Sequence, residues 1–472
     1  MIATSIREIT SALRGRVIQG DPAAVFTSVA TDTRKMRANA LFFALVGERY
    51  DAHSFLAQAV AAGAGGLVVS RREDFPPGVP VIMVENTLSA LQSLAAYNRQ
   101  RSGVSLVGVT GSTGKTTTKD MIASVLGARL RTLKNEGNFN NEIGLPLTLL
   151  ELDESHEAAV VEMAMRGPGQ IHALCEIARP MGAVITNINE THLELLGTLS
   201  NIAEAKGEIL EQIPSGGFAV LNAESPFMQR EAGRCRGKVS YYAIDRPAEI
   251  RGESVKAEGA GSRFNAVIGG QPREFYLPLP GRHNVMNALA AIGVGLEMGL
   301  TVEEIAGGLS AVTTTGMRLE VIECGSLKII NDTYNASPAS TRAALGVLKD
   351  LAGGRRMVAV LGSMMELGAR ARGGHREVGE TAAALGLDCL ITVGELAGHI
   401  GEGAVDAGFP PEKVFRRQDY DSAVKILEGL LQEGDVVLVK GSRGMKMERF
   451  VQCLLKRPQS LSGAGSPIIT GD

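Results

Sequence analysis

Apolar residues along this chain gather into short, nearly continuous runs, and each run is followed by a longer segment of mixed polarity. Four such runs lie at 104–109, 158–163, 182–187 and 218–222. Their length and continuity are typical of parallel strands that are buried on both faces of a sheet. Because the segments between them have the length and pattern of helices, we predict a doubly wound, mostly parallel α/β sheet.

The same alternation of strands and helices occurs on either side of this central part. Strand-like runs at 66–70 and 79–84 precede a helical stretch that reaches Gln100, and further runs follow a turn-forming stretch at 313–316. We therefore predict an α/β protein of three domains with a tail. The predicted boundaries are 1–102 for a small N-terminal domain, 103–314 for a central domain, 315–456 for a Rossmann-like C-terminal domain and 457–472 for a flexible tail rich in Ser, Gly and Pro.

Charge balance and composition narrow the class of protein. The 472 residues include 48 Lys+Arg and 51 Asp+Glu, a formal net charge of −3, and 44% are hydrophobic. These values exclude bulk electrostatic binding of nucleic acid and an intrinsically disordered chain. There are 57 glycines, about 12% of the chain against an average of about 7%, which indicates many tight strand-to-helix turns. The lack of Trp and an aromatic content of 4% argue against stacking platforms for single-stranded nucleic acid.

Cysteine usage and the length of the apolar runs bear on the compartment. The five cysteines form no C-x-x-C pair and no Cys/His spacing of a zinc site; they are Cys175, Cys235, Cys324, Cys389 and Cys453. The apolar runs are shorter than the 18 or so residues of a membrane span, and the first residues lack the pattern of a signal peptide. We expect a reduced, cytoplasmic protein without membrane insertion.

One glycine-rich segment carries the sharpest chemical signal. The sequence GVTGSTGKTT, residues 108–117, follows a predicted strand and opens a predicted helix. In that context backbone amides and the positive helix end bind polyphosphate, while Lys115 neutralises the β- and γ-phosphates and the Thr116 hydroxyl binds Mg²⁺. The strict motif needs glycine in place of Val109, so the loop is a variant, and a glycine-rich turn with a solvated lysine is the alternative. The predicted ATP ligands here are Gly111, Ser112, Thr113, Gly114, Lys115, Thr116 and Thr117.

Two further polar side chains follow strands of the same predicted sheet. Glu162 ends one strand, and His192 comes shortly after the next. The carboxyl ends of parallel strands form the ligand crevice of an open α/β sheet, so both side chains can face the phosphate loop and hold a second cation. Taken singly, the two have ordinary interpretations as a solvated acid and a loop histidine. Lys206 by itself has only the pattern of a lysine on a helix surface.

These motifs occur together in an order that resembles the Mur ligase family. The shared segments span nearly the whole chain, and NFNNEIGLP, MRGPGQI and NDTYNASP resemble in particular the branch that joins D-alanyl-D-alanine to UDP-MurNAc-tripeptide. Ala164 departs from the pattern, because the family usually has glycine there. The other matching segments are TDTR at 31–34, GERYD at 47–51, GSTGKTTTKD, NINETHLE, AKGEIL, GRHNVMNALAA, GSMMELG and KGSR at 440–443.

The resemblance implies an ATP- and Mg²⁺-dependent amide ligase of peptidoglycan synthesis. ATP would phosphorylate the C-terminal carboxylate of UDP-MurNAc-tripeptide, and the amine of D-Ala-D-Ala would attack the acyl phosphate. Family members typically carry a carbamylated lysine at the position of Lys206. The implied catalytic residues are Lys115, Glu162, His192 and Lys206, and the implied Mg²⁺ ligands are Thr116, Glu162, His192 and the Lys206 carbamate.

The resemblance also distributes the substrates over the three domains of an expected monomer. The N-terminal domain would bind the uridine nucleotide, the central domain ATP and the C-terminal domain D-Ala-D-Ala, and the last two would close onto each other for turnover. The implied ligands are Asn284 for adenine, Arg318 for phosphate, Asp332 for ribose, Asp32, Thr33 and Arg34 for uridine, Asn138, Asn140 and Asn141 for the muramoyl peptide, and Asn335 and Ser337 for D-Ala-D-Ala.

Three alternative functions stay open at this point. Another ligase of the same architecture, of Mur or folylpolyglutamate type, would join a different amino acid. A nucleotide-dependent switch would share the phosphate loop but would not need Glu162 or His192. A kinase would leave the first and third domains unexplained. Within the favoured interpretation, the third residue of the tripeptide can be meso-diaminopimelate or L-lysine.

Overall fold

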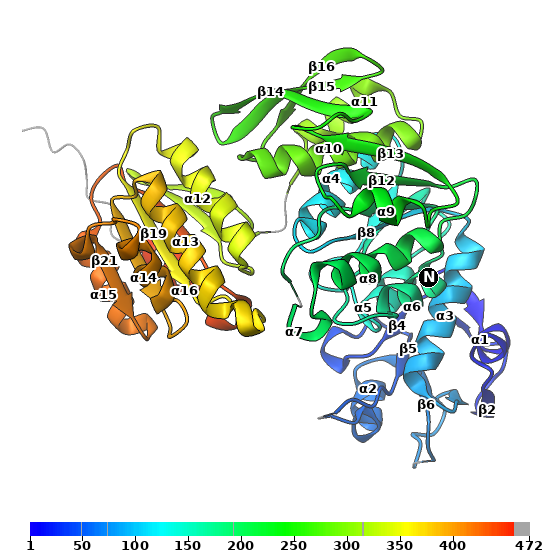
Figure 1. The fold of residues 1–472 in the computed structure, drawn as a ribbon. Helices are drawn as coiled ribbons and strands as arrows, with labels where there is room; N and C mark the ends of the chain where they lie inside the picture. The colour runs from blue at the N-terminus through cyan, green and yellow to red at the C-terminus, as the bar shows by residue number, and fades with distance from the viewer. Residues whose placement is uncertain (49, 73, 192, 314–315, 457–472) are drawn as a thin grey trace, which may run out of the picture. The chain divides into compact units, whose positions relative to one another are not determined.

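The computed structural model describes residues 1–48, 50–72, 74–191, 193–313 and 316–456. The chain divides into two compact units (Figure 1). The predicted tail, 457–472, and Thr314 and Thr315 of the turn-forming stretch 313–316 lie outside the described residues. The first unit comprises Met1–Pro278 and Arg282–Thr315, and the second comprises Leu279–Gly281 and Gly316–Asp472.

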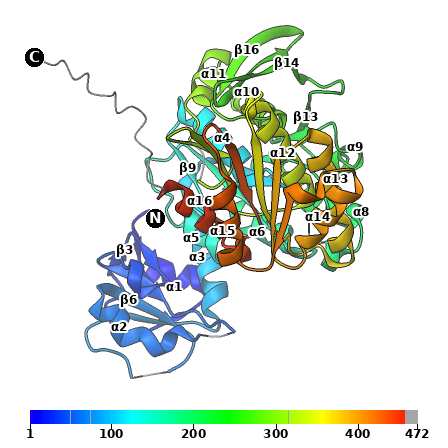
Figure 2. The same ribbon diagram turned by 90° about the vertical axis from the view of Figure 1, so that its left-hand side faces the viewer.

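The N-terminal part of the first unit is built on a five-stranded sheet, drawn in blue in Figure 2. Its elements are β1 (Thr4–Ser5), α1 (Ile6–Leu13), β2 (Arg16–Gln19), β3 (Val25–Phe26), β4 (Val29–Ala30), β5 (Ala40–Phe43), α2 (Leu56–Ala61), β6 (Ala64–Val69), β7 (Val81–Met83) and α3 (Thr87–Ser102). The strand order is β2-β7-β6-β5-β4, with β2 antiparallel at the edge and the others parallel. Strands β1 and β3 form a separate antiparallel pair.

Helix α3 ends at Ser102, next to a glycine that stops the helix. Gly103 follows the helix with φ 64°, a left-handed conformation that glycine adopts without a Cβ clash. The helix also ties the N-terminal part to the next sheet, because the buried Asn98 amide donates to the carbonyls of Leu149 at 2.8 Å and Leu152 at 3.0 Å. The first two predicted domains therefore pack together as one unit.

The central part of the first unit is a nine-stranded sheet. Its elements are β8 (Ser105–Thr110), α4 (Lys115–Gly127), β9 (Thr132–Lys134), α5 (Gly144–Leu149), β10 (Ala158–Glu162), α6 (Gln170–Ala178), β11 (Gly182–Ile185), α7 (Leu193–Leu196), α8 (Leu199–Glu211), β12 (Phe218–Asn222), α9 (Met228–Ala232), β13 (Lys238–Ala243), β14 (Ile250–Glu258), β15 (Gly261–Ile268), β16 (Gln271–Leu277), α10 (Arg282–Glu297) and α11 (Val302–Ser310). The order is β16-β15-β14-β13-β12-β11-β8-β10-β9. All pairs from β9 to β14 are parallel, which confirms the predicted doubly wound, mostly parallel sheet.

The antiparallel strands β14, β15 and β16 at one edge are absent from the sequence-based prediction. Figure 1 shows them beside α10 and α11. Buried and half-buried positions alternate in β15, and several positions of β14 and β16 are exposed. Antiparallel strands with one solvated face lack the continuous apolar runs that marked the parallel strands, so the pattern used for prediction passed over them.

Helices cover both faces of the parallel part of this sheet. On one face, α3, α5, α6 and α8 share a hydrophobic core with Leu106, Val161 and Ala183 of the strands. On the other face, α10 comes so close to the sheet at Gly293 that a Cβ there would lie 2.7 Å from Val220. Helix α4 packs against α10 and α11 on this second face. The phosphate loop between β8 and α4 therefore lies at the carboxyl end of an inner strand of a sheet that helices cover on both faces.

The second unit is a six-stranded sheet between two layers of helices (Figures 1 and 2). Its elements are β17 (Glu320–Cys324), β18 (Leu327–Asp332), α12 (Pro338–Ala352), β19 (Met357–Gly362), α13 (Ala371–Leu385), β20 (Cys389–Val393), α14 (Gly398–Asp406), β21 (Val414–Arg417), α15 (Tyr420–Leu430), β22 (Val436–Lys440) and α16 (Glu448–Leu455). The order is β17-β18-β22-β19-β20-β21, parallel except for the β17-β18 hairpin. Ala359 and Leu361 of β19 pack with α12, α13 and α14, whereas Val358 and Val360 pack with α15 and α16.

Helix length and polarity determine whether a helix can cross a membrane. Among the helices of the described residues, none is long and apolar enough to cross a bilayer.

Candidate active site

The predicted phosphate loop connects β8 to α4, and two glycines give it its shape. Gly111 and Gly114 have φ of 144° and 79°, which side chains other than glycine rarely adopt. A Cβ on Gly111 would lie 1.9 Å from Thr186 Oγ1, and one on Gly114 would lie 2.8 Å from Asn287 Oδ1. The loop is thus a tight strand-to-helix turn at the N-terminus of α4, the context in which backbone amides bind phosphate.

The segment after β11 holds this loop from the side. The Thr113 amide donates to Asn187 Oδ1 at 2.9 Å, and the Thr186 hydroxyl donates to the Thr113 carbonyl at 2.6 Å. The Ser112 hydroxyl accepts from the Asn189 amide at 2.9 Å. The sequence analysis assigned only His192 in this segment and missed Thr186, Asn187 and Asn189. A usable signal was available, since a run of polar residues directly follows the strand that neighbours β8.

Lys115 opens α4 and turns its side chain back over the loop. Its Nζ donates to the carbonyls of Gly111 at 3.0 Å and Ser112 at 3.3 Å. The ammonium therefore lies directly above the turn where the β- and γ-phosphates of a nucleotide would bind. Thr117 follows on the first turn of the helix and is buried.

Glu162 lies at the end of β10, level with Val109 of β8, and is 3% exposed. Its two carboxylate oxygens have separate partners. The Thr116 hydroxyl donates to Oε2 at 2.6 Å, and Asn140 Nδ2 donates to Oε1 at 2.8 Å. The structure thus brings together three of the residues predicted from the sequence, one from the phosphate loop, one from the strand end and one from the NFNNE segment.

Behind Glu162 lies a buried polar support that the sequence analysis missed. The Glu162 amide donates to Asn135 Oδ1 at 2.9 Å, and Lys119 Nζ donates to the Asn135 carbonyl at 2.6 Å. Lys119 also forms an ion pair with Asp120 at 3.3 Å. Burial lowers the pKa of Lys119, against the opposing effect of Asp120 and Glu162. This support fixes the backbone at the strand end from which the Glu162 carboxylate projects.

The structure corrects the expectation for Lys206, whose local sequence pattern indicated a lysine on a helix surface. Its side chain on α8 is buried, with 2% exposed. Burial lowers its pKa well below the ordinary value, and the nearby charge of Lys115 lowers it further, while Glu162 acts in the opposite direction. Within the described part of the chain, Lys206 Nζ makes no hydrogen bond or ion pair. Lys206 is therefore a buried amine on which the charges of Lys115 and Glu162 act.

One of the four metal ligands that the sequence analysis predicts lies outside the described residues, namely His192. Among the described residues there is no group of three or more His, Cys, Asp or Glu side chains that could hold a metal ion. The predicted set instead joins a hydroxyl, a carboxylate and a modified lysine, of which Thr116 and Glu162 are in direct contact.

Asn284, the predicted adenine ligand, lies in the first turn of α10 and is 3% exposed. Its Oδ1 accepts from Asn287 Nδ2 at 3.3 Å. Asn287 in turn is the residue against which Gly114 packs. The helix after β16 is thus tied to the phosphate loop through Asn287, which the sequence analysis did not assign.

Further residues predicted to bind the UDP-linked substrate make contacts within their own segments. Asp32 caps the 3₁₀ helix Thr33–Lys35 and forms an ion pair with Arg34 at 2.7 Å, and the hydrogen bonds from Arg34 lower the pKa of Asp32 to about 2. Asn138 lies in an exposed turn. Asn141 accepts from the Gly144 amide at 2.9 Å at the start of α5, which is a structural role.

In the second unit, the predicted ligands form a cluster of their own. Asp332 at the end of β18 forms an ion pair with Lys440 at 2.6 Å, and Lys440 also donates to the Asn335 carbonyl at 2.8 Å. The Arg318 guanidinium lies 4.0 Å from the centre of the Tyr334 ring.

Arg318 Nε is buried without a hydrogen-bond partner in the described structure. An unsatisfied buried donor of this kind is one that a ligand can satisfy. Ser337 caps α12 in a reciprocal hydrogen-bond pair with Ser340, so its hydroxyl already has a structural role.

Comparison with known proteins gives consistent matches over nearly the whole chain. The Mur ligase middle domain matches residues 109–295, and the Mur ligase glutamate ligase domain matches residues 317–443. A UDP-N-acetylmuramoyl-tripeptide–D-alanyl-D-alanine ligase of Bacillus subtilis is 41% identical over 463 residues, which cover 98% of this chain and 100% of the relative. The protein of the same name in Escherichia coli is 36% identical over 460 residues, or 96% and 99% of the two chains.

Solved structures agree with these matches. MurF from Acinetobacter baumannii superposes with a TM-score of 0.88 at 31% identity and covers 96% of this chain and 99% of its own. A MurF ligase from Thermotoga maritima in complex with ADP has a TM-score of 0.81 at 28% identity, with coverage of 91% and 97%. A folylpolyglutamate synthase from Mycobacterium tuberculosis, at 19% identity and a TM-score of 0.62, shares the fold alone.

Proposed function

The chain belongs to the Mur ligase family, and on that premise we propose that it joins D-alanyl-D-alanine to UDP-MurNAc-tripeptide with the hydrolysis of ATP to ADP. The observation that carries the proposal is the cluster of Lys115, Thr116 and Glu162 at the phosphate loop. Relatives of that activity match over nearly their full length, which supports this substrate pair over the folylpolyglutamate-type alternative.

The chemistry requires an activated carboxyl group, because oxide is a poor leaving group and phosphate is a good one. A carboxylate oxygen of the tripeptide attacks the γ-phosphorus of ATP, which forms an acyl phosphate and releases ADP. The amine nitrogen of D-Ala-D-Ala then forms a bond to the acyl carbon, the phosphate leaves with the electron pair of the C–O bond, and the nitrogen loses a proton. The protein contributes mostly position and charge in such reactions. Lys115 is placed to neutralise charge at the transferring phosphoryl group.

The residues at the loop fit a Mg²⁺ ion. A hydroxyl and a carboxylate are the oxygen ligands that Mg²⁺ prefers, and Thr116 Oγ1 and Glu162 Oε2 lie 2.6 Å apart on adjacent elements. When bound, Mg²⁺ would reduce the repulsion between ATP and the substrate carboxylate. His192 would complete the set, and Asn140 would orient the Glu162 carboxylate through Oε1.

Lys206 would serve as a ligand after carbamylation. A neutral lysine nitrogen can form a bond to the carbon of CO₂ and release a proton, which turns a cation into an anionic oxygen donor. Burial next to another ammonium favours the neutral amine that this reaction needs. The lowered pKa of Lys206 and its burial support this assignment.

The remaining ligands follow the family pattern and are part of the same proposal. The N-terminal domain, 1–102, would bind the uridine nucleotide through Asp32, Thr33 and Arg34. Residues 103–314 would bind ATP, with Asn284 at the adenine, and residues 315–456 would supply Arg318 and Asp332 to the nucleotide and receive D-Ala-D-Ala through Asn335 and Ser337. Asn138, Asn140 and Asn141 would contact the muramoyl peptide. We also propose that the enzyme is a cytoplasmic monomer, and light scattering would test the oligomeric state.

The deciding experiment is a phosphate-release assay with purified protein, ATP and Mg²⁺. We expect release only when both UDP-MurNAc-tripeptide and D-Ala-D-Ala are present, together with a product of the mass of UDP-MurNAc-pentapeptide. Phosphate release that does not depend on D-Ala-D-Ala would reject the proposal. A competition between the meso-diaminopimelate and L-lysine tripeptides in the same assay identifies the natural third residue.

A further inference from the structure

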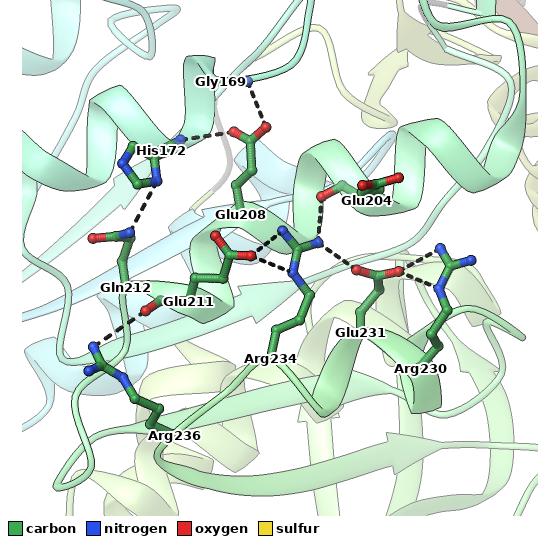
Figure 3. Close-up of polar contacts among 10 residues, drawn as sticks. All are labelled: Gly169, His172, Glu204, Glu208, Glu211, Gln212, Arg230, Glu231, Arg234 and Arg236. Atoms are coloured by element: carbon green, nitrogen blue, oxygen red, sulfur yellow. Dashed lines mark hydrogen bonds and ion pairs between the residues drawn. The ribbon is translucent and has the colours of Figure 1, made fainter.

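Three consecutive residues of α8 face three different parts of the first unit. Lys206 is buried on the side of the phosphate loop, and the charges of Lys115 and Glu162 shift its pKa in opposite directions. Gly207 faces Glu231 of α9. Glu208 faces the start of α6, as Figure 3 shows. Because Lys206 Nζ makes no hydrogen bond or ion pair within the described residues, the position of its amine depends on how α8 is held by these neighbours.

On the Gly207 side, α8 packs closely against an ion-pair network around the buried Glu231. A Cβ on Gly207 would lie 2.3 Å from Glu231 Oε2 and 2.4 Å from Arg234 Nη1. Arg234 Nη1 donates both to Glu231 Oε2 at 2.7 Å and to the α8 backbone at the Glu204 carbonyl, also at 2.7 Å. Glycine within a helix costs about 1 kcal/mol against alanine. Here it permits the arginine to lie directly on the helix beside Lys206.

On the other side, the Glu208 carboxylate caps a different helix. Its Oε1 accepts from the Gly169 amide at 2.6 Å and its Oε2 from the His172 amide at 3.0 Å, as Figure 3 shows. The N-cap of α6 is Gly169, which has no side chain, and the first turn of α6, Gln170-Ile-His-Ala173, contains no acidic residue. Glu208 therefore supplies from α8 the carboxylate that a helix N-terminus prefers.

The helix that Glu208 caps begins eight positions after Glu162 in the chain, directly after the segment 163–169. Charge-assisted bonds from a carboxylate to two backbone amides are short and directional. Glu208 thus links the helix that carries Lys206 to the segment that follows Glu162, and it does so two residues from Lys206. No other contact in the described structure joins these two elements through a charged side chain bonded to the backbone.

We propose that Glu208 is a positioning residue that holds the Lys206 nitrogen at a fixed place relative to Glu162. The inference rests on the proposed function, in which a Lys206 carbamate and Glu162 share a cation. Loosening the link would let the two ligands drift apart and would weaken formation of the carbamate. Outer partners of metal ligands commonly change affinity or activity by about 10- to 100-fold when they are replaced.

The test uses the full-length enzyme and the substitution Glu208→Gln, which keeps the side-chain volume but leaves one acceptor oxygen for two amides. The matched control is Glu204→Gln one turn earlier on α8. The Glu204 carboxylate is exposed and makes no bond within the described residues. Carbamate is measured by NMR in ¹³C-labelled bicarbonate, with Lys206→Arg to assign the signal. Turnover is measured against bicarbonate concentration.

We expect E208Q to need at least about tenfold more bicarbonate than wild type for half of the carbamate signal and of the turnover, and E204Q to behave as wild type. A purely structural role would lower the unfolding midpoint and the folded fraction without moving the bicarbonate dependence. If E208Q does not fold, E208D is compared with E204D by the same readouts.

Equal bicarbonate dependence of E208Q and E204Q, with the signal present in wild type, would overturn the positioning role alone. A wild-type enzyme without the Lys206 signal would reject the carbamate of the proposed function and this inference with it. The phosphate-release assay tests the ligase activity itself, and its outcome does not depend on either of these two results.

Discussion

The Thr116 hydroxyl donates a hydrogen bond of 2.6 Å to Glu162 Oε2, which joins the first turn of α4 to the end of β10. The two residues are 46 positions apart in the chain, and the parallel pairing of β8 with β10 brings them together. The contact turns two separate sequence motifs into one set of oxygen ligands beside the phosphate loop.

Replacing Glu162 with glutamine tests its role as a cation ligand. The amide keeps the shape but loses the charge, so we expect kcat to fall by about 100-fold or more, while ATP binding stays within about threefold of wild type. ADP formation and calorimetric ATP binding measure the two effects. The exposed Glu154→Gln is the control. Full turnover in E162Q would favour a nucleotide-dependent switch over a ligase that needs this carboxylate.

Replacing the glycines at the two ends of α4 with alanine should change the free energy of unfolding in opposite directions. Gly114 has φ 79° and would bring a Cβ 2.8 Å from Asn287 Oδ1. We expect G114A to be destabilised by about 1–2 kcal/mol and to bind ATP more weakly. Gly127 has open space around it, and G127A should be stabilised by about 1 kcal/mol. Urea unfolding measures both, and a G114A variant as stable as G127A would contradict the loop geometry.

Breaking the ion pair of Lys440 and Asp332 should greatly reduce the stability of the second unit. The two side chains are 3% and 13% exposed and lie 2.6 Å apart. Lys440→Met would leave a mostly buried carboxylate without its cation, which costs about 3–5 kcal/mol. Thermal unfolding of K440M is compared with that of the exposed Lys425→Met.

A second substitution separates this charge effect from lost packing. Adding Asp332→Asn to K440M removes the unpaired charge, so the double variant should be more stable than K440M alone. A double variant that is no more stable would show that packing, and not the charge, sets the loss.

His375 predicts how stability depends on pH. The ring is buried, its Nε2 accepts from the Met364 amide at 2.9 Å, and its Nδ1 lies 2.6 Å from the Ala371 carbonyl. Burial lowers the pKa of His375 below the ordinary 6.5. Below about pH 6.5 the unfolded chain therefore binds a proton that the folded ring resists. This contribution to stability is complete above pH 6.5 and is lost as the pH falls toward the lower folded pKa, by up to about 1.4 kcal/mol per pH unit.

Urea unfolding between pH 8 and pH 5 checks this expectation. His375→Gln should show a shallower loss of stability with falling pH than wild type, although it is less stable at pH 8. Equal slopes for wild type and H375Q would show that His375 does not control this region of the curve.

Much of the parallel framework could be predicted because its signals are local. Strand β12 occupies the same residues as the predicted apolar run 218–222, since strands buried on both faces are nearly continuous apolar runs. The phosphate loop was equally predictable, because its glycines and lysine lie within one turn. Strands β14, β15 and β16 were not, because one side of them is solvated.

The supporting residues of the site were harder to predict. Asn135 and Asn187 act through hydrogen bonds to residues 27 and 74 positions away in the chain. Asn287 packs on Gly114, which lies 173 positions away. Asparagine at a turn has many local explanations, so the residue type alone does not indicate such a partner. Only the arrangement of β10, β11 and α10 around the phosphate loop gives these side chains their roles.

The sequence by itself determined the α/β class, the parallel strands and the phosphate loop, and its motifs pointed to the family. These features follow from residue patterns within one element or one turn. The tertiary structure decided that Lys206, a surface lysine by its local pattern, is a buried amine, and that Glu208 beside it caps α6. Burial and the electrostatic environment depend on which helices and strands pack together from distant parts of the chain, and no local pattern specifies that.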